Sequence, residues 1–102
     1  VAGIGAWHYN TSGQLWWSAE TREIHGVTAD FTPALDTAID FYIPEHRPII
    51  SAAVEAALRD RTAWDLELCI RRADGQLRHV RARGRLADSG RLRTTRLIGN
   101  FE

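Results

Sequence analysis

The sequence contains no methionine and no lysine, has a single cysteine, and carries no net charge. The lone Cys69 excludes an internal disulfide and is compatible with a reducing compartment, which favours a cytoplasmic location. No apolar run approaches the roughly 18 residues that a membrane span needs, and no basic-then-apolar leader opens the chain. We therefore expect contact with a membrane only through segments outside this sequence.

The length of 102 residues accommodates one small domain with one core. An apolar share of 44% is ordinary for a globular fold and argues against disorder. The chain begins at Val1 without a methionine and ends at Glu102, within an expected strand. We therefore expect residues 1–102 to form a single domain that belongs to a larger protein.

The first residues predict a hairpin and a short helix. Aromatic and apolar residues at 4–9 and 14–17 favour two strands, and residues 10–13 between them have turn chemistry. Ser18 is suited to cap a helix, and Gly26 is suited to end it in the left-handed conformation.

Two further helices are expected before the sequence changes period. Thr32 and Pro33 form a helix-start signal, a capping hydroxyl followed by a proline in the first turn. After Pro48 an apolar stripe at helical spacing predicts the longest helix, which runs to about Arg59. The residues of this stripe are Ile50, Ala53, Val54, Ala57 and Leu58.

The second half of the chain alternates with the period of a half-buried strand. Residues 64–71 show this alternation, and Asp74-Gly75 is a strong hairpin turn signal. A second alternating strand contains Val80, a further turn is expected at 88–90, and residues 92–101 predict the last strand. Two strands before the helices and three after them can form one sheet. The predicted class is α+β: a five-stranded antiparallel sheet with helices packed on one face.

This order of elements resembles the PAS fold, and several stretches are similar to PAS sensor domains of bacterial and archaeal signalling proteins. The similar stretches include the opening hairpin, a helix ending in I-x-G, a hydrophobic-x-P-E-H-R element before the long helix, and three strands with an E-x-R…D-G…W-V pattern. They are residues 5–7, 15–18, 23–26, 41–48, 65–68, 72–75, 79–81 and 84. The resemblance covers the chain from about Gly5 to Phe101, and it departs at His79, where the family often carries tryptophan.

The resemblance implies a sensory module. Such domains bind small ligands or cofactors between sheet and helices, or dimerise, and relay a change to an attached output domain such as a histidine kinase or diguanylate cyclase. The implied mechanism is a small shift of sheet or helix that biases a bistable dimer. We accordingly expect a homodimer with an output domain in the same chain, and no catalysis by this domain itself.

The sequence leaves the cofactor unknown, but it favours neither a flavin adduct nor haem. Flavin-adduct relatives need a reactive cysteine just before the long helix, whereas Cys69 lies in the middle of a strand. Haem needs an axial ligand, commonly a histidine on the long helix, and the residues after Pro48 supply none. His46 lies just before that helix and is expected in solvent. We expect structural roles and no metal site for all four histidines, which are His8, His25, His46 and His79.

The charged residues favour neither catalysis nor nucleic-acid binding. Asp65 and Glu67 alternate outward from the apolar strand face, where burial cannot tune their pKa. No nucleophile elbow, phosphate loop or paired carboxylate appears, so we expect no catalytic residues. Nine arginines lie from Arg71 to Arg96. Zero net charge and the lack of a nucleic-acid motif favour a solvated or dimer-facing sheet surface instead.

Two hypotheses about the apolar core stay open. In the first, a small apolar or aromatic ligand binds between the sheet and the long helix; in the second, the core is filled and the domain is a ligand-free dimerisation relay. The candidate ligand-binding residues are Trp16, Ile50, Val54, Leu66, Leu68 and Val80. Trp16 and Trp17 must face opposite sides of their strand, so one belongs to the core or pocket. The four tryptophans suit either an aromatic pocket or a filled core.

Overall fold

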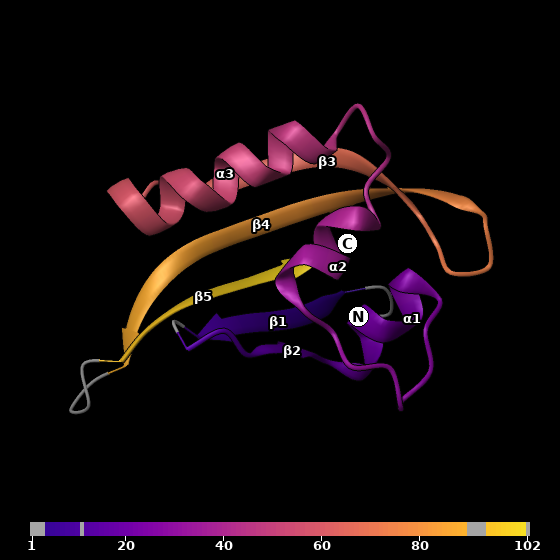
Figure 1. The fold of residues 1–102 in the computed structure, drawn as a ribbon, viewed down its shortest axis with the longest axis horizontal. Helices are drawn as coiled ribbons and strands as arrows, with labels where there is room; N and C mark the ends of the chain where they lie inside the picture. Colours follow the sequence, from indigo (N-terminus) through magenta and orange to yellow (C-terminus); the bar gives the residue numbers. More distant parts are fainter. Residues whose placement is uncertain (1–3, 11, 90–93, 102) are drawn as a thin grey trace.

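The computed structural model describes residues 4–10, 12–89 and 94–101. They form one five-stranded antiparallel sheet with the strand order β2-β1-β5-β4-β3, and the helices cover one of its faces (Figure 1). We call that face the inner face. The elements are β1 (Gly5–Asn10), β2 (Leu15–Trp17), α1 (Ala19–His25), α2 (Leu35–Asp40), α3 (Arg47–Asp60), β3 (Trp64–Arg71), β4 (Leu77–Ser89) and β5 (Thr94–Phe101). The predicted α+β class is confirmed.

The helix α1 is held firmly to β1 by the predicted cap. The Ser18 hydroxyl accepts hydrogen bonds from the N–H groups of Thr21 at 3.3 Å and of Ala6 at 2.9 Å. The Thr21 hydroxyl donates to the Ala6 carbonyl at 2.8 Å. Gly26 ends the helix with φ 73°, a conformation that favours glycine. Both predicted ends of this helix are confirmed.

The predicted start of the second helix is wrong by two residues. The cap residue of α2 is Ala34, and Pro33 lies outside the helix. The hydroxyl of Thr37, inside the first turn, accepts from the Ala34 N–H at 3.1 Å and donates to the Ala34 carbonyl at 3.0 Å. The cap residue Ala34 has no hydroxyl to accept from the first turn, and Thr37 instead bonds to the main chain of Ala34.

The bounds of the long helix α3 agree with the prediction, with Pro48 in its first turn. The predicted apolar stripe is wrong at Leu58, which is 42% exposed, because the buried side of the helix follows Ile50, Val54 and Ala57.

The turn predicted at 88–90 is wrong at Asp88 and Ser89. Asp88 pairs with Thr95 and Ser89 pairs with Thr94, so β4 continues through both residues. Gly90, and residues 92–93 of the predicted last strand, lie outside the described residues. The hydrogen-bond ladder with β5 overrides the local turn preference of aspartate and serine.

The chain's own segment Phe41–His46 lies along the edge of β3. The Ile43 N–H donates to the Cys69 carbonyl at 3.0 Å, and the Arg71 N–H donates to the Phe41 carbonyl at 2.7 Å. The Cys69 N–H donates to Nδ1 of His46 at 2.9 Å. Cys69 is buried although the strand alternation places it on the same side as exposed residues. Half of this sheet edge is thus closed from within the chain.

Candidate ligand cavity

Two tryptophans lie over a pair of glycines on the inner face of the sheet. Trp7 pairs with Gly99, Gly99 with Gly84, and Gly84 with Trp64, so the four residues form one row across β1, β5, β4 and β3. The two indole rings stack with their centroids 5.8 Å apart. A Cβ on Gly84 would lie 2.2 Å from the Trp64 ring, and one on Gly99 would lie 2.5 Å from the Trp7 ring. The missing side chains make room for the rings to lie on the sheet.

A cavity of about 50 Å³ lies between this row and the helices. Its lining is apolar and aromatic, and among the described residues that line it the side-chain polar atoms are indole nitrogens and one tyrosine hydroxyl. The sheet contributes Trp7, Leu15, Trp17, Trp64, Ala82 and Phe101, and the helices with their connection contribute Leu35, Ala38, Ile39, Tyr42, Ile50 and Val54. This is an apolar space between sheet and long helix, as the first hypothesis requires.

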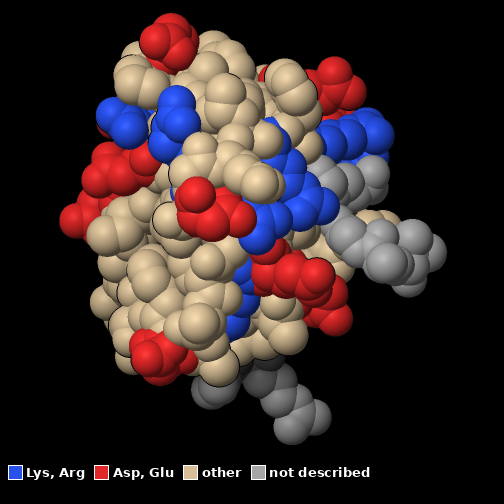
Figure 2. All heavy atoms as spheres, turned by 90° about the vertical axis from the view of Figure 1, so that its right-hand side faces the viewer, with Lys and Arg blue, Asp and Glu red and all other residues tan. Residues whose placement is uncertain are grey.

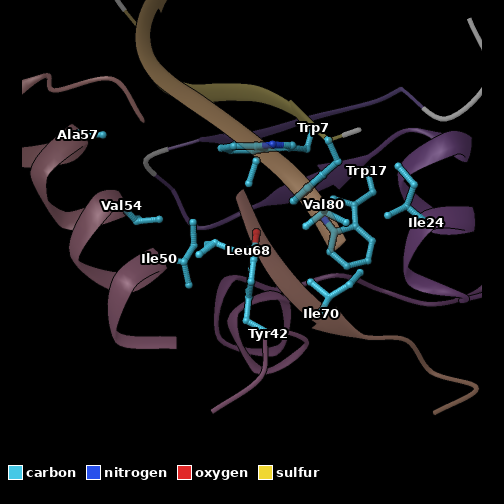
Figure 3. Close-up of a cluster of buried hydrophobic side chains, with 12 residues drawn as sticks. Trp7, Trp17, Ile24, Tyr42, Ile50, Val54, Ala57, Leu68, Ile70 and Val80 are labelled. Atoms are coloured by element: carbon cyan, nitrogen blue, oxygen red, sulfur yellow. The ribbon is translucent and has the colours of Figure 1, made fainter. Parts of the chain in front are cut away.

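Two of the predicted ligand-binding residues line this cavity. Ile50 and Val54 project from α3 toward the sheet (Figure 3). Leu68 and Val80 are buried in the same core cluster but do not line the cavity. Leu66 is half-buried and lies in a separate groove at the edge of the sheet. The set predicted from the sequence is therefore split between the cavity wall, the core behind it and the sheet edge.

Trp16 lies on the outer face of the sheet, away from the cavity. Its side chain is 48% exposed and stacks on His8 with a centroid distance of 5.0 Å, whereas Trp17 is 3% exposed and lines the cavity. The strand period fixes that the two face opposite sides, but it does not say which faces inward. The hairpin register would have decided, because Trp17 pairs with the inward-facing Trp7.

Tyr42 lines the cavity although it was not among the predicted ligand-binding residues, and Trp7, Trp17 and Trp64, which the sequence left open between pocket and core, line it as well. The Tyr42 hydroxyl points into the core (Figure 3), and burial raises the pKa of Tyr42 well above its usual range. The indole nitrogens of Trp7 and Trp64 are buried without a hydrogen-bond partner among the described residues. Indole N–H groups carry no charge, so the described lining of the cavity is uncharged.

A dense aromatic cluster fills the inner face beside the cavity. His25 is fully buried and stacks on Trp17 at 4.2 Å, and it meets Phe41 and Phe101 edge-on. Its Nδ1 donates to the Thr21 carbonyl at 2.8 Å, while Nε2 has no partner among the described residues. Burial lowers the pKa of His25 to about 4. The ring is therefore neutral at pH 7.

The outer face and the molecular surface carry charges of both signs. Arg81 binds Asp65 with two hydrogen bonds of 2.8 and 2.7 Å, and Arg83 lies 3.6 Å from the same carboxylate. The bond from Arg81 lowers the pKa of Asp65. The face drawn in Figure 2 shows acidic and basic groups side by side, with no broad patch of one sign.

Within the described residues, no helix is long and apolar enough to cross a membrane. The same residues contain no group of three or more His, Cys, Asp or Glu side chains arranged to hold a metal ion. A flavin adduct would need a cysteine just before the long helix. Cys69 instead lies within β3, where it is buried.

Comparison with known proteins agrees with this architecture. The model of the family described as PAS fold matches residues 14–101. A sensory box histidine kinase/response regulator from Burkholderia thailandensis is similar in structure, with TM-score 0.77, 24% identity, and coverage of 99% of this chain and 76% of that one. The N-terminal domain of a diguanylate cyclase with PAS/PAC sensor from Marinobacter aquaeolei matches with TM-score 0.81, 12% identity, and coverage of 97% and 93%.

A third similar structure is the Cycle PAS-B domain of Drosophila melanogaster with bound ethylene glycol. It matches with TM-score 0.73, 7% identity, and coverage of 96% of this chain and 97% of that one. At these identities the three structures show a shared fold alone. No curated protein matches the sequence at a significant level.

Proposed function

The chain belongs to the PAS fold family, and on that premise we propose that it is a sensory module that binds a small apolar molecule beneath α2 and α3. The observation that carries this proposal is the cavity of about 50 Å³ in the apolar core. Apolar cavities of this kind stay dry, so their walls lack contact partners on one side. A compact apolar ligand supplies those contacts. The proposed contact residues are Trp7, Tyr42, Ile50, Val54, Trp64 and Ala82.

The size of the cavity links binding to movement. An apolar cavity that admits benzene measures about 150 Å³, roughly three times the space found here. A ligand of more than a few atoms must therefore push the lining elements apart. The helix α2 is the least anchored of them, because it has six residues and none is fully buried. We expect α2 to move away from the sheet when such a ligand enters.

This displacement is the proposed signal. Two of the similar structures are a sensory box histidine kinase/response regulator and the N-terminal domain of a diguanylate cyclase with PAS/PAC sensor, which supports an output domain in the same chain. We propose that the domain acts within a homodimer and that movement of α2 biases that dimer between two arrangements. Catalysis belongs to the output domain in this proposal.

Xenon is a suitable probe for the cavity, because its atom fits a small dry space. Xenon added to the purified protein is expected to shift the NMR signals of Ile50 and Val54 in a saturable manner. The substitution Val54→Phe fills the cavity and should abolish the shifts, whereas Leu58→Phe on the exposed side of α3 should leave them unchanged. Native mass spectrometry of the same preparation reports any ligand retained from the cell.

The experiment also separates the two hypotheses about the core. Saturable xenon binding that is lost in Val54→Phe supports the ligand-binding function. No xenon shift in the wild-type protein, together with a clean apo mass, contradicts it. The ligand-free dimerisation relay would then be the better description.

A further inference from the structure

A second hollow lies at the free edge of the sheet, between α3 and the first half of β3. This edge groove has a volume of about 420 Å³ and shares only Trp64 with the ligand cavity. The helix contributes Ile49, Ala52, Ala53 and Ala56, the connection contributes Thr62 and Ala63, and the strand contributes Trp64, Asp65 and Leu66. Ile49 is 44% exposed, so the groove presents apolar surface to solvent.

The strand beside the groove has main-chain groups that no described residue pairs. In an antiparallel strand, every second residue points its N–H and C=O to the same side. Cys69 and Arg71 point theirs away from β4, toward Phe41–His46. Asp65 and Glu67 therefore point theirs the same way, and among the described residues no hydrogen bond reaches these groups on that side. This half of the edge is open.

The covered half shows how a segment fits this edge. Tyr42 pairs with Ile70 in an antiparallel bridge, and its neighbours Phe41 and Ile43 make the main-chain hydrogen bonds. The side chain of Tyr42 points inward, between helix and sheet. In a segment paired with Asp65 and Glu67, the residue opposite Leu66 would likewise point its side chain inward. That side chain would enter the groove, which small alanines line on the helix side.

We propose that this open edge is a docking site for an extended basic peptide, which adds a short antiparallel strand to β3. Main-chain hydrogen bonds to Asp65 and Glu67 supply the pairing, as in strand addition generally. The residue opposite Leu66 is a small apolar one that enters the groove. The two residues on either side of it face the outer surface, beside the carboxylates of Asp65 and Glu67, and are arginine or lysine.

Charge complementarity selects this occupant over a second copy of the chain. Two β3 strands paired antiparallel about Leu66 would bring Asp65 of each copy opposite Glu67 of the other, and like charges in that position are unfavourable. Asp65 is partly neutralised by Arg81 and Arg83, while Glu67 is exposed and has no ion pair among the described residues. Glu67 is therefore the main anchor for a cationic side chain.

The test uses a fluorescein-labelled peptide, Thr-Val-Arg-Val-Arg-Val-Thr, and the intact protein. Fluorescence anisotropy is expected to show saturable binding, and the matched peptide Thr-Val-Glu-Val-Glu-Val-Thr is expected not to bind. Hydrogen exchange followed by NMR gives the location. The amides of Asp65 and Glu67 should exchange at least about tenfold more slowly with the arginine peptide, because they become hydrogen-bonded. The amides of Leu66 and Leu68, which face β4, should not change.

Protein variants give independent support. Glu67→Lys should weaken binding by about fivefold, since it opposes the peptide with a like charge, whereas Glu23→Lys on α1 should have no effect. Ala52→Trp should block the groove, and Leu58→Trp on the same helix is its control. Circular dichroism checks that each variant is folded.

Three results would overturn the proposal. The first is equal binding of the glutamate peptide, and the second is no binding of either peptide. The third is slow exchange of the Asp65 and Glu67 amides in the free protein that depends on protein concentration, because a second copy would then occupy the edge. Each result is independent of whether xenon enters the ligand cavity, so this proposal and the sensory function can fail separately.

Discussion

The inner face of the sheet has a packed end and a hollow end. The packed end consists of aromatic rings in stacked, tilted or edge-on contact, with ring centroids 4.2 to 6.0 Å apart. They are Trp17, His25, Phe31, Phe41 and Phe101. At the hollow end, the side chains around Val54 leave a cavity of about 50 Å³. Trp17 and Phe101 belong to both ends and separate them.

The difference follows from how the covering helices are attached. The helix α1 is held to β1 by hydrogen bonds through Ser18 and Thr21, and its buried His25 packs against the aromatic rings. The helix α2 has no fully buried residue and no hydrogen bond to the sheet among the described residues. One half of the face thus serves as a rigid anchor, and the other half has room to adapt to a ligand.

The largest expected effect lies at the packed end. Trp17→Ala removes the ring that stacks on His25 and Phe31, and large-to-small changes of this kind cost about 4 kcal/mol of unfolding free energy. Urea denaturation measures the loss. A cost below about 1 kcal/mol would mean that this end is not tightly packed and that the contrast between the two ends is wrong.

The buried His25 predicts a pH dependence that belongs to the packed end. The unfolded chain protonates this ring near pH 6.5, but the folded protein only near pH 4, because burial and the nearby Arg72 and Arg78 oppose the charge. Between these values the unfolded state binds more protons, so stability falls as the pH is lowered from 6.5 to 4. The loss is about 3 kcal/mol.

Denaturation at a series of pH values tests this dependence. The variant His25→Asn should show a shallower loss of stability over the same pH range, and His79→Asn, at an exposed position, should behave like the wild-type protein. An unchanged slope in His25→Asn would assign the acid sensitivity to other groups.

The smallest effect is expected at the hollow end. Val54→Ala enlarges the existing cavity and should cost about 2 kcal/mol. This loss should be recovered in part under xenon, because the enlarged apolar space holds xenon more fully. The loss in Phe31→Ala, at a half-buried residue of the packed end that does not line the cavity, should not be recovered. Thermal denaturation with and without xenon makes the comparison. Equal responses of the two variants to xenon would remove the distinction between the ends.

Local signals predicted much of the fold. The cap at Ser18, the glycine end at Gly26 and the Asp74-Gly75 turn each depend on chemistry within a few residues, and the structure contains all three. Signals that compete with longer-range pairing were less reliable. Asp88 and Ser89 have turn character, but their pairing with β5 keeps them in β4. Thr32 was expected to cap α2, where Thr37 bonds to Ala34 instead.

The cavity was less accessible to sequence reasoning than the fold. Helical spacing placed Ile50 and Val54 on the inner side of α3, and both line the cavity. The strand period alone does not say which face Trp16 lies on; the register of the hairpin is needed for that. The row from Trp7 to Trp64 joins residues from four strands, so only the full sheet topology reveals it.

The glycines beneath the two indole rings have a consequence for how related sequences diverge. A side chain at position 84 requires a smaller residue at 64, because the two share a single volume. A side chain at 99 would collide first with the main-chain carbonyl of Arg83, so a smaller residue at 7 would not be enough to admit it. Positions 84 and 64 should therefore change together over evolutionary time, whereas 99 should stay glycine. A relative that keeps Trp64 but carries alanine at 84 must have moved the indole ring, and its internal space with it.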